Sequence, residues 1–336
     1  MATDLQQLVE AADLNALLRA VDGLCASGRW DELIDLAEAC EQAVERGKQL
    51  WPIAAHIDYR LALEAPGDYA ASVLAGARSR FALGPLSEVA ASTHRWEELA
   101  PHLPDPQIAA YVAQERVLRG EDLRGDARAH NEVLEMPLIL EEWEPTYALA
   151  TYKSTFVEVA EPWEPKSSLE DAEVRAGPIA DDPELRDALL DLVTPWTAES
   201  NGAARAIVVE GDAPSAAAAL TFSELRVGPL DGDEALQRLA WAASSGGAHG
   251  RRRGAAAGRF SAWYVASLLG GTAWPPAAGV LEAAVEELRW FRWDEGAPEE
   301  GWVLRIAADH PSDGWAAALA ATDVQEEAPR APRSTR

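Results

Sequence analysis

Lysine is nearly missing from this chain: only three of its 29 basic residues are lysines, and the other 26 are arginines. Acidic residues number 56, so the formal net charge is −27 at pH 7. A negative field of that size opposes binding to the phosphates of double-stranded nucleic acid. The imbalance is strongest in residues 1–200, which hold 38 acidic and 16 basic residues. Solubility alone explains such a charge, and so does a protein partner with a basic face, which is the partner we expect.

Cysteine is also scarce, with only Cys25 and Cys40, and no Cys-x-x-Cys pair occurs. This excludes a thioredoxin-type motif and a clustered zinc site. Both thiols lie in helix-like stretches, and we expect them in the core. The six histidines do not cluster at metal-ligand spacing, so we predict no metal and no cofactor. The first residues lack the basic and apolar regions of a signal peptide, so we expect a cytoplasmic protein.

The motifs of several common enzyme classes are missing as well. The sequence has no phosphate-binding loop, dinucleotide fingerprint, His-Glu-x-x-His zinc motif, Gly-x-Ser-x-Gly nucleophile motif or EF-hand loop. Asp309, His310 and Ser312 are the residue types of a catalytic triad, but triads assemble through space and not by adjacency. A cap on a final helix explains these residues better. The missing motifs favour a non-enzymatic role and leave the question of an enzyme open.

One long uncharged run has to be tested as a membrane span. Residues 260–281 carry no charge, and three arginines, 251–253, precede them. Gly270-Gly271 and Pro275-Pro276 cut the run into pieces too short for a hydrocarbon core of about 30 Å. We therefore predict a buried helix followed by a turn, and no membrane partner.

Residues 1–135 show the apolar spacing of amphipathic helices joined by short loops. In residues 31–46 the apolar positions recur every three or four residues, at Leu33, Leu36/Ala37, Cys40 and Val44. Similar stripes, each ended by glycine or proline, occupy residues 50–61, 69–83 and 107–119. Helices with loops this short pack as antiparallel neighbours. The pattern predicts an acidic helical-hairpin array over residues 1–135.

A short repeat lies within this array. Residues 29–33, Arg-Trp-Asp-Glu-Leu, recur with one conservative change at residues 95–99, which is 66 residues or two periods of about 33 further on. With Gly28 and Ala37, the first copy resembles the first helix of a tetratricopeptide-like repeat. The resemblance covers about the first third of the chain and lacks the regular glycine and proline signature. HEAT-like or irregular helical stacking fits as well, and so does a coincidental pentapeptide.

The rest of the chain divides by composition. Residues 136–182 are a junction rich in Pro, Trp and Glu, with strand-like residues between 147 and 159. Asp182 followed by Pro183 then marks a helix start. Residues 183–325 are predicted to form a Trp-rich α+β domain, and residues 326–336 a disordered tail. In that domain we expect a strand at 205–210, helices at 234–244 and 278–288, a hairpin of 290–294 with 302–308, and a last helix from Pro311 to Ala321.

The fold class predicted from these patterns is mainly α with a smaller α+β part. Its N-terminal part is the repeat-like antiparallel helical array. Its C-terminal part combines helices with a short antiparallel sheet or hairpin.

The strongest local anomaly is the Gly/Arg segment, residues 246–259, in which four arginines fall within nine residues. Glycines let backbone N–H groups approach an anion, arginines can fork onto it, and a helix begins at about Phe260. Trp263 could stack one turn further on. Docking on the acidic N-terminal domain, or simple solvation, explains the arginines better than a ligand site does. The candidate ligand-binding residues are His249, Gly250, Arg251, Arg252, Arg253, Arg259 and Trp263.

Three functions are compatible with this sequence. The first is a non-enzymatic interaction or adaptor protein, supported by the helical array, the acidic surface and the missing catalytic motifs. The second is a C-terminal domain that binds an anion or phosphate ligand through residues 246–259, with or without catalysis. The third is an acidic immunity or antitoxin-like protein. As a whole the chain resembles the conserved, uncharacterised proteins of GC-rich bacterial genomes, and this resemblance implies no function.

Overall fold

The computed structural model describes residues 5–75, 83–103, 105–161, 164, 166–222, 224–296 and 300–324. The chain forms two compact units. Unit 1 consists of Met1–Glu142, Ala148–Glu161 and Gly254–Ala256. Unit 2 consists of Trp143–Tyr147, Pro162–Arg253 and Ala257–Arg336. The predicted tail, residues 326–336, lies outside the described residues.

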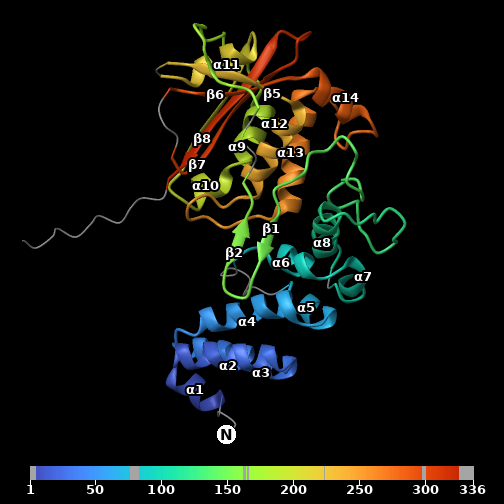
Figure 1. The fold of residues 1–336 in the computed structure, drawn as a ribbon, viewed down its shortest axis with the longest axis vertical. Helices are drawn as coiled ribbons and strands as arrows, with labels where there is room; N and C mark the ends of the chain where they lie inside the picture. The colour runs from blue at the N-terminus through green and yellow to red at the C-terminus, as the bar shows by residue number, and fades with distance from the viewer. Residues whose placement is uncertain are drawn as a thin grey trace, which may run out of the picture. The chain divides into compact units, whose positions relative to one another are not determined.

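Unit 1 is built mainly from helices, and its α2, α3 and α4 pack side by side (Figure 1). Two of its helices begin at an aspartate whose carboxylate accepts a backbone N–H of the first turn: Asp13 caps α2 and Asp105 caps α8. The helices are α1 (Leu5–Ala11), α2 (Leu14–Ala26), α3 (Trp30–Glu45), α4 (Trp51–Glu64), α5 (Gly67–Ser72), α6 (Leu86–Thr93), α7 (Trp96–Leu99), the 3-10 helix η2 (Ala100–His102) and α8 (Pro106–Leu118). A small antiparallel hairpin pairs β1 (Ala150–Tyr152) with β2 (Val157–Val159).

The core of unit 1 follows the predicted helical stripes. In α3 the buried residues include Leu33, Leu36, Ala37 and Cys40. Both cysteines are free and buried, as predicted. The helix expected over residues 69–83 is wrong in length, because α5 ends at Ser72, and residues 76–82 of that prediction lie outside the described residues. Both copies of the pentapeptide do begin a helix, α3 and α7.

Unit 2 contains a six-stranded sheet in the order β3-β5-β6-β7-β8-β4, with all neighbours antiparallel. The strands are β3 (Glu170–Asp171), β4 (Ala203–Glu210), β5 (Arg226–Leu230), β6 (Arg289–Asp294), β7 (Trp302–Asp309) and β8 (Trp315–Asp323). The helices are α9 (Pro183–Asp191), α10 (Thr194–Ala198), α11 (Ala213–Leu220), α12 (Gly232–Ser244), α13 (Ala255–Leu269) and α14 (Val280–Glu287). The first two residues of α13 belong to unit 1. Figure 1 shows α11 on one side of the sheet and α12 on the other.

Alanines let α11 lie close to the sheet. Ala213, Ala216 and Ala217 of the helix pack against Ala316 and Ala318 of β8 in one buried cluster. Small side chains on both surfaces bring the helix axis near the strands and leave no room for water. Asp212 caps this helix, since its carboxylate accepts the Ser215 N–H at 3.0 Å.

The predicted last helix, Pro311–Ala321, is wrong: residues 315–323 form β8 instead. Alanine has the highest helix propensity, which explains the prediction. In the fold, β8 lies between β4 and β7, and both of its edges are paired over eight residues. Central-strand hydrogen bonding and burial on both faces outweigh the local propensity. The prediction that Asp309 to Ser312 cap this helix fails with it, because Asp309 ends β7.

The fold class is confirmed, with helices in the N-terminal part and an α+β C-terminal part. The hairpin of β6 and β7, the β4 strand, and the helix capped by Asp182 are also confirmed. The sheet is larger than expected, because β8 joins it. Helix α13 begins at Ala255, five residues before the predicted start. Among the described residues, none of the helices has the length and apolar character needed to cross a bilayer.

Candidate functional site

The arginines of the Gly/Arg segment point to different partners within unit 2. Arg251 is exposed and lies 3.3 Å from the carboxylate of Glu199. Arg252 donates to Ser244 Oγ at 3.4 Å, and Arg253 donates to the backbone oxygen of Asp191 at 3.0 Å. The guanidinium groups of Arg251 and Arg253 therefore have different partners.

The backbone N–H groups of the same segment are taken by side chains of unit 2. Ala248 N–H donates to Asp323 Oδ2 at 2.6 Å, and His249 N–H donates to Ser200 Oγ at 3.1 Å. Arg251 N–H donates to Glu199 Oε2 at 3.0 Å. At Gly250 a Cβ atom would lie 2.5 Å from the Pro195 oxygen, so only glycine fits there. These glycines bring the backbone close to carboxylates of the chain itself, and an external anion stays a prediction.

Arg259 and Trp263 belong to a different, fully buried cluster. Arg259 Nε and Nη2 donate to the two oxygens of Glu144 at 2.8 and 2.5 Å. Trp263 Nε1 and the Tyr147 hydroxyl donate to the same carboxylate at 3.0 and 2.7 Å. The Arg259 guanidinium also lies 5.2 Å from the Trp263 ring centre. These two residues thus differ from Arg251 and Arg253 in their partners as well as in their exposure.

Electrostatics in the cluster of Arg259, Glu144, Tyr147 and Trp263 favour a neutral tyrosine beside a charged pair. Burial raises the pKa of Tyr147 well above its ordinary value, and the neighbouring Glu144 charge adds to the effect. Burial also acts to lower the pKa of Arg259, but the hydrogen bonds and charge of Glu144 outweigh it and the pKa is raised. The buried carboxylate is satisfied by four donors, so the cluster is a structural support for α13.

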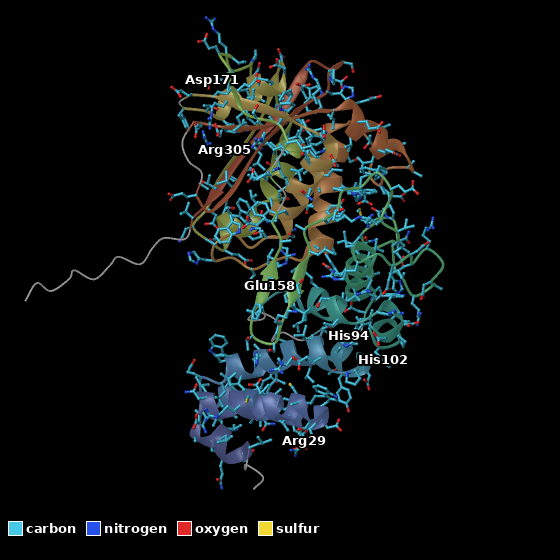
Figure 2. The ribbon with its side chains drawn as sticks, in the orientation of Figure 1. Arg29, His94, His102, Glu158, Asp171 and Arg305 are labelled. Atoms are coloured by element: carbon cyan, nitrogen blue, oxygen red, sulfur yellow. The ribbon has the colours of Figure 1, made fainter. Side chains whose placement is uncertain are left out.

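The described histidines are not gathered in one site. His94, at the end of α6, lies 2.7 Å from the Ala65 oxygen through Nε2, whereas His102 comes from η2 (Figure 2). Within the described ranges, no group of three or more His, Cys, Asp or Glu side chains is arranged to hold a metal ion.

Unit 1 carries a partly apolar groove of about 420 Å³, which we call the α2–α4 groove. Its walls come from α2, α4, the turn of the β1–β2 hairpin and Leu83. The lining residues are Leu18, Asp22, Trp51, Pro52, Ala55, His56, Tyr59, Leu83, Ser154 and Thr155.

Large apolar side chains are exposed in the α2–α4 groove, although unit 1 buries most of its others. Leu18, Trp51 and Leu83 are 39%, 40% and 42% exposed. Leu14 and Leu18 stand four residues apart on α2, as do Trp51 and Ala55 on α4, so each pair shares one face of its helix. Contiguous exposed apolar side chains with a polar rim are typical of an interaction site.

The polar side chains of the α2–α4 groove differ in protonation and in exposure. Burial lowers the pKa of His56, with Arg60 as the second cause, so the ring is neutral at pH 7. Burial raises the pKa of Tyr59 to about 12, and its hydroxyl donates to the Lys153 oxygen. Arg60 donates to Asp22 Oδ1 at 2.6 Å, while the Asp22 side chain stays 61% exposed. The groove therefore presents a neutral floor and one exposed carboxylate at its rim.

A model of a family of unknown function, DUF6183, matches residues 15–325. The chain belongs to the DUF6183 family. No curated protein and no solved structure matches it. The expectation of a family without a characterised function is confirmed, whereas the likeness to tetratricopeptide or HEAT-like repeats remains a resemblance.

A second cavity of this DUF6183 chain lies in unit 2 and is wider and more polar, with a volume of about 750 Å³. One wall is the segment 171–175, marked by Asp171 in Figure 2, and the other includes Thr221 at the end of α11. Asp171, Glu173 and Glu224 line it together with Arg175. A cluster of acidic side chains is not by itself a binding site, so we propose none in this cavity.

Sequence reasoning missed the residues of the α2–α4 groove in the DUF6183 chain. One signal was present: Leu14 and Leu18 lie outside the buried stripe of α2, which is Leu17, Val21, Leu24 and Cys25. A second was Trp51, which precedes the first buried residue of α4. Apolar residues off the buried stripe are the feature that points to a binding face.

Proposed function

We propose that this protein is a non-enzymatic interaction protein whose α2–α4 groove binds an amphipathic, basic segment of another protein. The observation that carries the proposal is the row of exposed apolar side chains, Leu18, Trp51 and Leu83, in one groove of unit 1. An amphipathic helix fits such a groove because its apolar side chains recur every three or four residues along one face. The apolar pairs on α2 and on α4 have the same spacing.

Charge complementarity supports a basic occupant. The ranges Met1–Glu142 and Ala148–Glu161 of unit 1 hold 27 acidic and 13 basic residues. At the groove itself, the exposed carboxylate of Asp22 stands beside the apolar floor. Lys or Arg residues beside the apolar anchors of the bound segment would strengthen binding in two ways. The negative charge of unit 1 would speed association, and the Asp22 carboxylate would accept a charge-assisted hydrogen bond.

A peptide-display selection on the full chain tests the proposal. The probe is a library of 16-residue peptides, and selected peptides are synthesised and titrated by fluorescence anisotropy. We expect apolar residues four apart with flanking Lys or Arg. Trp51→Ala should weaken binding at least about tenfold, since buried aromatic anchors dominate such interfaces. Leu18→Lys should weaken binding as well, because it removes an apolar side chain from the groove and places a positive charge near the basic residues of the peptide.

Phe222→Ala is the matched control, because Phe222 is an exposed aromatic residue of unit 2 at 84% exposure. It should leave the affinity unchanged, and melting curves should show that all variants are folded. Selected peptides that are acidic would overturn the proposal. Equal affinity for Trp51→Ala, Leu18→Lys and the unaltered chain would also overturn it.

A further inference from the structure

The strand β4 forms one edge of the six-stranded sheet in unit 2, and other segments of unit 2 cover this edge at both ends. Near the end of the strand, the Val208 oxygen accepts the Ala180 N–H at 2.9 Å. Just before its start, the Gly202 N–H donates to the Trp196 oxygen of α10 at 2.8 Å. Val208 follows Gly202 by six residues, so the two covered positions stand about 20 Å apart along the strand.

Between these two positions, the backbone of Ala204 and Ala206 faces outward. In an antiparallel strand the N–H and C=O of one residue point the same way, and the direction alternates from residue to residue. Val208 points away from β8, because its partner Ala180 lies outside that strand, and β4 pairs with β8 without a bulge. The same alternation turns Ala204 and Ala206 away from β8. Among the residues that the structure describes, none makes a hydrogen bond to these outward N–H and C=O groups.

Arg205 lies in this open part of the edge strand, and its side chain is exposed. Its Nη2 donates to the Leu220 oxygen at 2.7 Å, and its guanidinium lies 4.4 Å from the centre of the Phe222 ring. These contacts orient the guanidinium but supply no counter-charge. Of the carboxylates in the described ranges, none forms an ion pair with Arg205, although the chain has 56 acidic residues. The open edge therefore carries a positive charge that a carboxylate from outside the chain can pair with.

A second copy of this chain does not fit the open edge. Two β4 strands that use both outward residues pair antiparallel with Ala204 opposite Ala206, and this register places the two Arg205 side chains opposite each other. Like charges directly opposite each other on neighbouring strands are destabilising. The same register sets Gly202 of one copy against Val208 of the other, and both of these positions are already covered.

An open strand edge accepts an added strand through main-chain hydrogen bonds. We infer that the open edge of β4, residues 203–207, binds a short extended segment of another protein that carries a carboxylate opposite Arg205. Opposite charges that face each other across two strands stabilise their pairing. The residues on either side of the carboxylate lie opposite Ala204 and Ala206, whose small, half-buried side chains leave room for β-branched ones. The rest of the segment is uncharged, because a chain of net charge −27 repels an acidic partner.

Amide hydrogen exchange of the full chain, measured by NMR with and without a peptide, tests this inference. The probe is acetyl-Thr-Val-Glu-Val-Thr-amide, which is about 17 Å long when extended and fits between the covered positions. Without peptide, the Ala204 and Ala206 amides should exchange near the intrinsic rate, whereas the Arg205 and Ile207 amides, which face β8, should be protected. At about 5 mM peptide, enough to detect a millimolar Kd, exchange of the two outward amides should slow at least about threefold.

A second peptide, with Lys in place of Glu, isolates the contribution of the Arg205 charge. It should bind at least about fivefold more weakly, because like charges then face each other across the two strands. Arg205→Glu should reverse the preference between the two peptides. Arg124→Glu is the matched control, since Arg124 is an arginine of unit 1 whose side chain is 63% exposed, and it should leave both affinities unchanged.

Three outcomes would overturn the inference. Protection of the Ala204 and Ala206 amides without peptide would show that the edge is not open. Unchanged exchange at the highest concentration of the Glu peptide would show that no strand is added. Equal affinity for the two peptides, in the unaltered chain or in a folded Arg205→Glu variant, would show that Arg205 does not select the segment. Protection of the Ile207 amide in that variant establishes that β4 is still paired with β8.

Discussion

Arg259 and Glu144 form an ion pair in which both side chains are 0% exposed, although 115 residues separate them in the chain. The pair joins α13 to the short segment Trp143–Tyr147 within unit 2. Its two parallel hydrogen bonds have the fork geometry in which arginine binds carboxylates best. The forked arginine–carboxylate contact, which made Arg259 a candidate ligand-binding residue, holds two segments of one unit together here.

Breaking this pair should be among the most destabilising single changes in unit 2. Arg259→Met leaves Glu144 buried without its counter-charge, and we expect a loss of about 3–5 kcal/mol of unfolding free energy in urea. The double variant Arg259→Met with Glu144→Leu should recover part of that loss, because no uncompensated charge remains. Arg251→Ala, at a pair with 57% and 40% exposure, should cost at most about 1 kcal/mol. Equal losses for Arg259→Met and Arg251→Ala would contradict the prediction.

Asp309 should stabilise unit 2 through two contacts on one carboxylate. Its Oδ2 accepts the Ala213 N–H at the start of α11 at 2.7 Å, and its Oδ1 accepts Arg289 Nε at 2.6 Å. Asp309→Asn keeps only one acceptor and removes the charge, so we expect about 1–3 kcal/mol of destabilisation in urea unfolding. Asp313→Asn, at a partly exposed carboxylate, is the control and should change stability by less than about 0.5 kcal/mol. A control as damaging as Asp309→Asn would argue against this role.

Two glycine-to-alanine changes should act in opposite directions. A Cβ atom at Gly258 would lie 2.3 Å from the Ala240 oxygen of α12, so Gly258→Ala should force the helices apart and cost about 1–3 kcal/mol. Gly23, inside α2, has no atom within 4 Å of the same position. Gly23→Ala should stabilise the protein by up to about 1 kcal/mol through helix propensity. Melting temperatures that shift in the same direction for both variants would refute this pair of predictions.

The two thiols should be inert in the folded protein. Burial raises the pKa of Cys25 and of Cys40 to about 11 each. At pH 8 almost no thiolate is present, and the side chains are enclosed by the core of unit 1. A chromogenic disulfide reagent should therefore label neither thiol within minutes in buffer and both in urea. Fast labelling of the native chain would show that this core opens readily.

Local sequence signals predicted the elements that depend on local rules. The stripe of α3, the cap at Asp182 and the pairing of β6 with β7 follow from apolar period, capping chemistry and strand alternation. Helix propensity misplaced residues 315–323, because nothing local distinguishes an alanine-rich helix from a central strand between β4 and β7. The partners of Arg259 could not be predicted, since Glu144 lies far away along the chain.

By itself, the sequence determined the negative charge, the helical character of the first part, the buried thiols and the concentration of glycine and arginine in segment 246–259. Those properties depend on residue type and on neighbours a few positions away. Only the tertiary structure decided which anions meet the N–H groups of that segment, which part of the β4 edge other segments cover, and which apolar residues of α2 and α4 stay exposed. These contacts and exposures depend on how segments distant in the chain pack together, and neither composition nor periodicity predicts that packing.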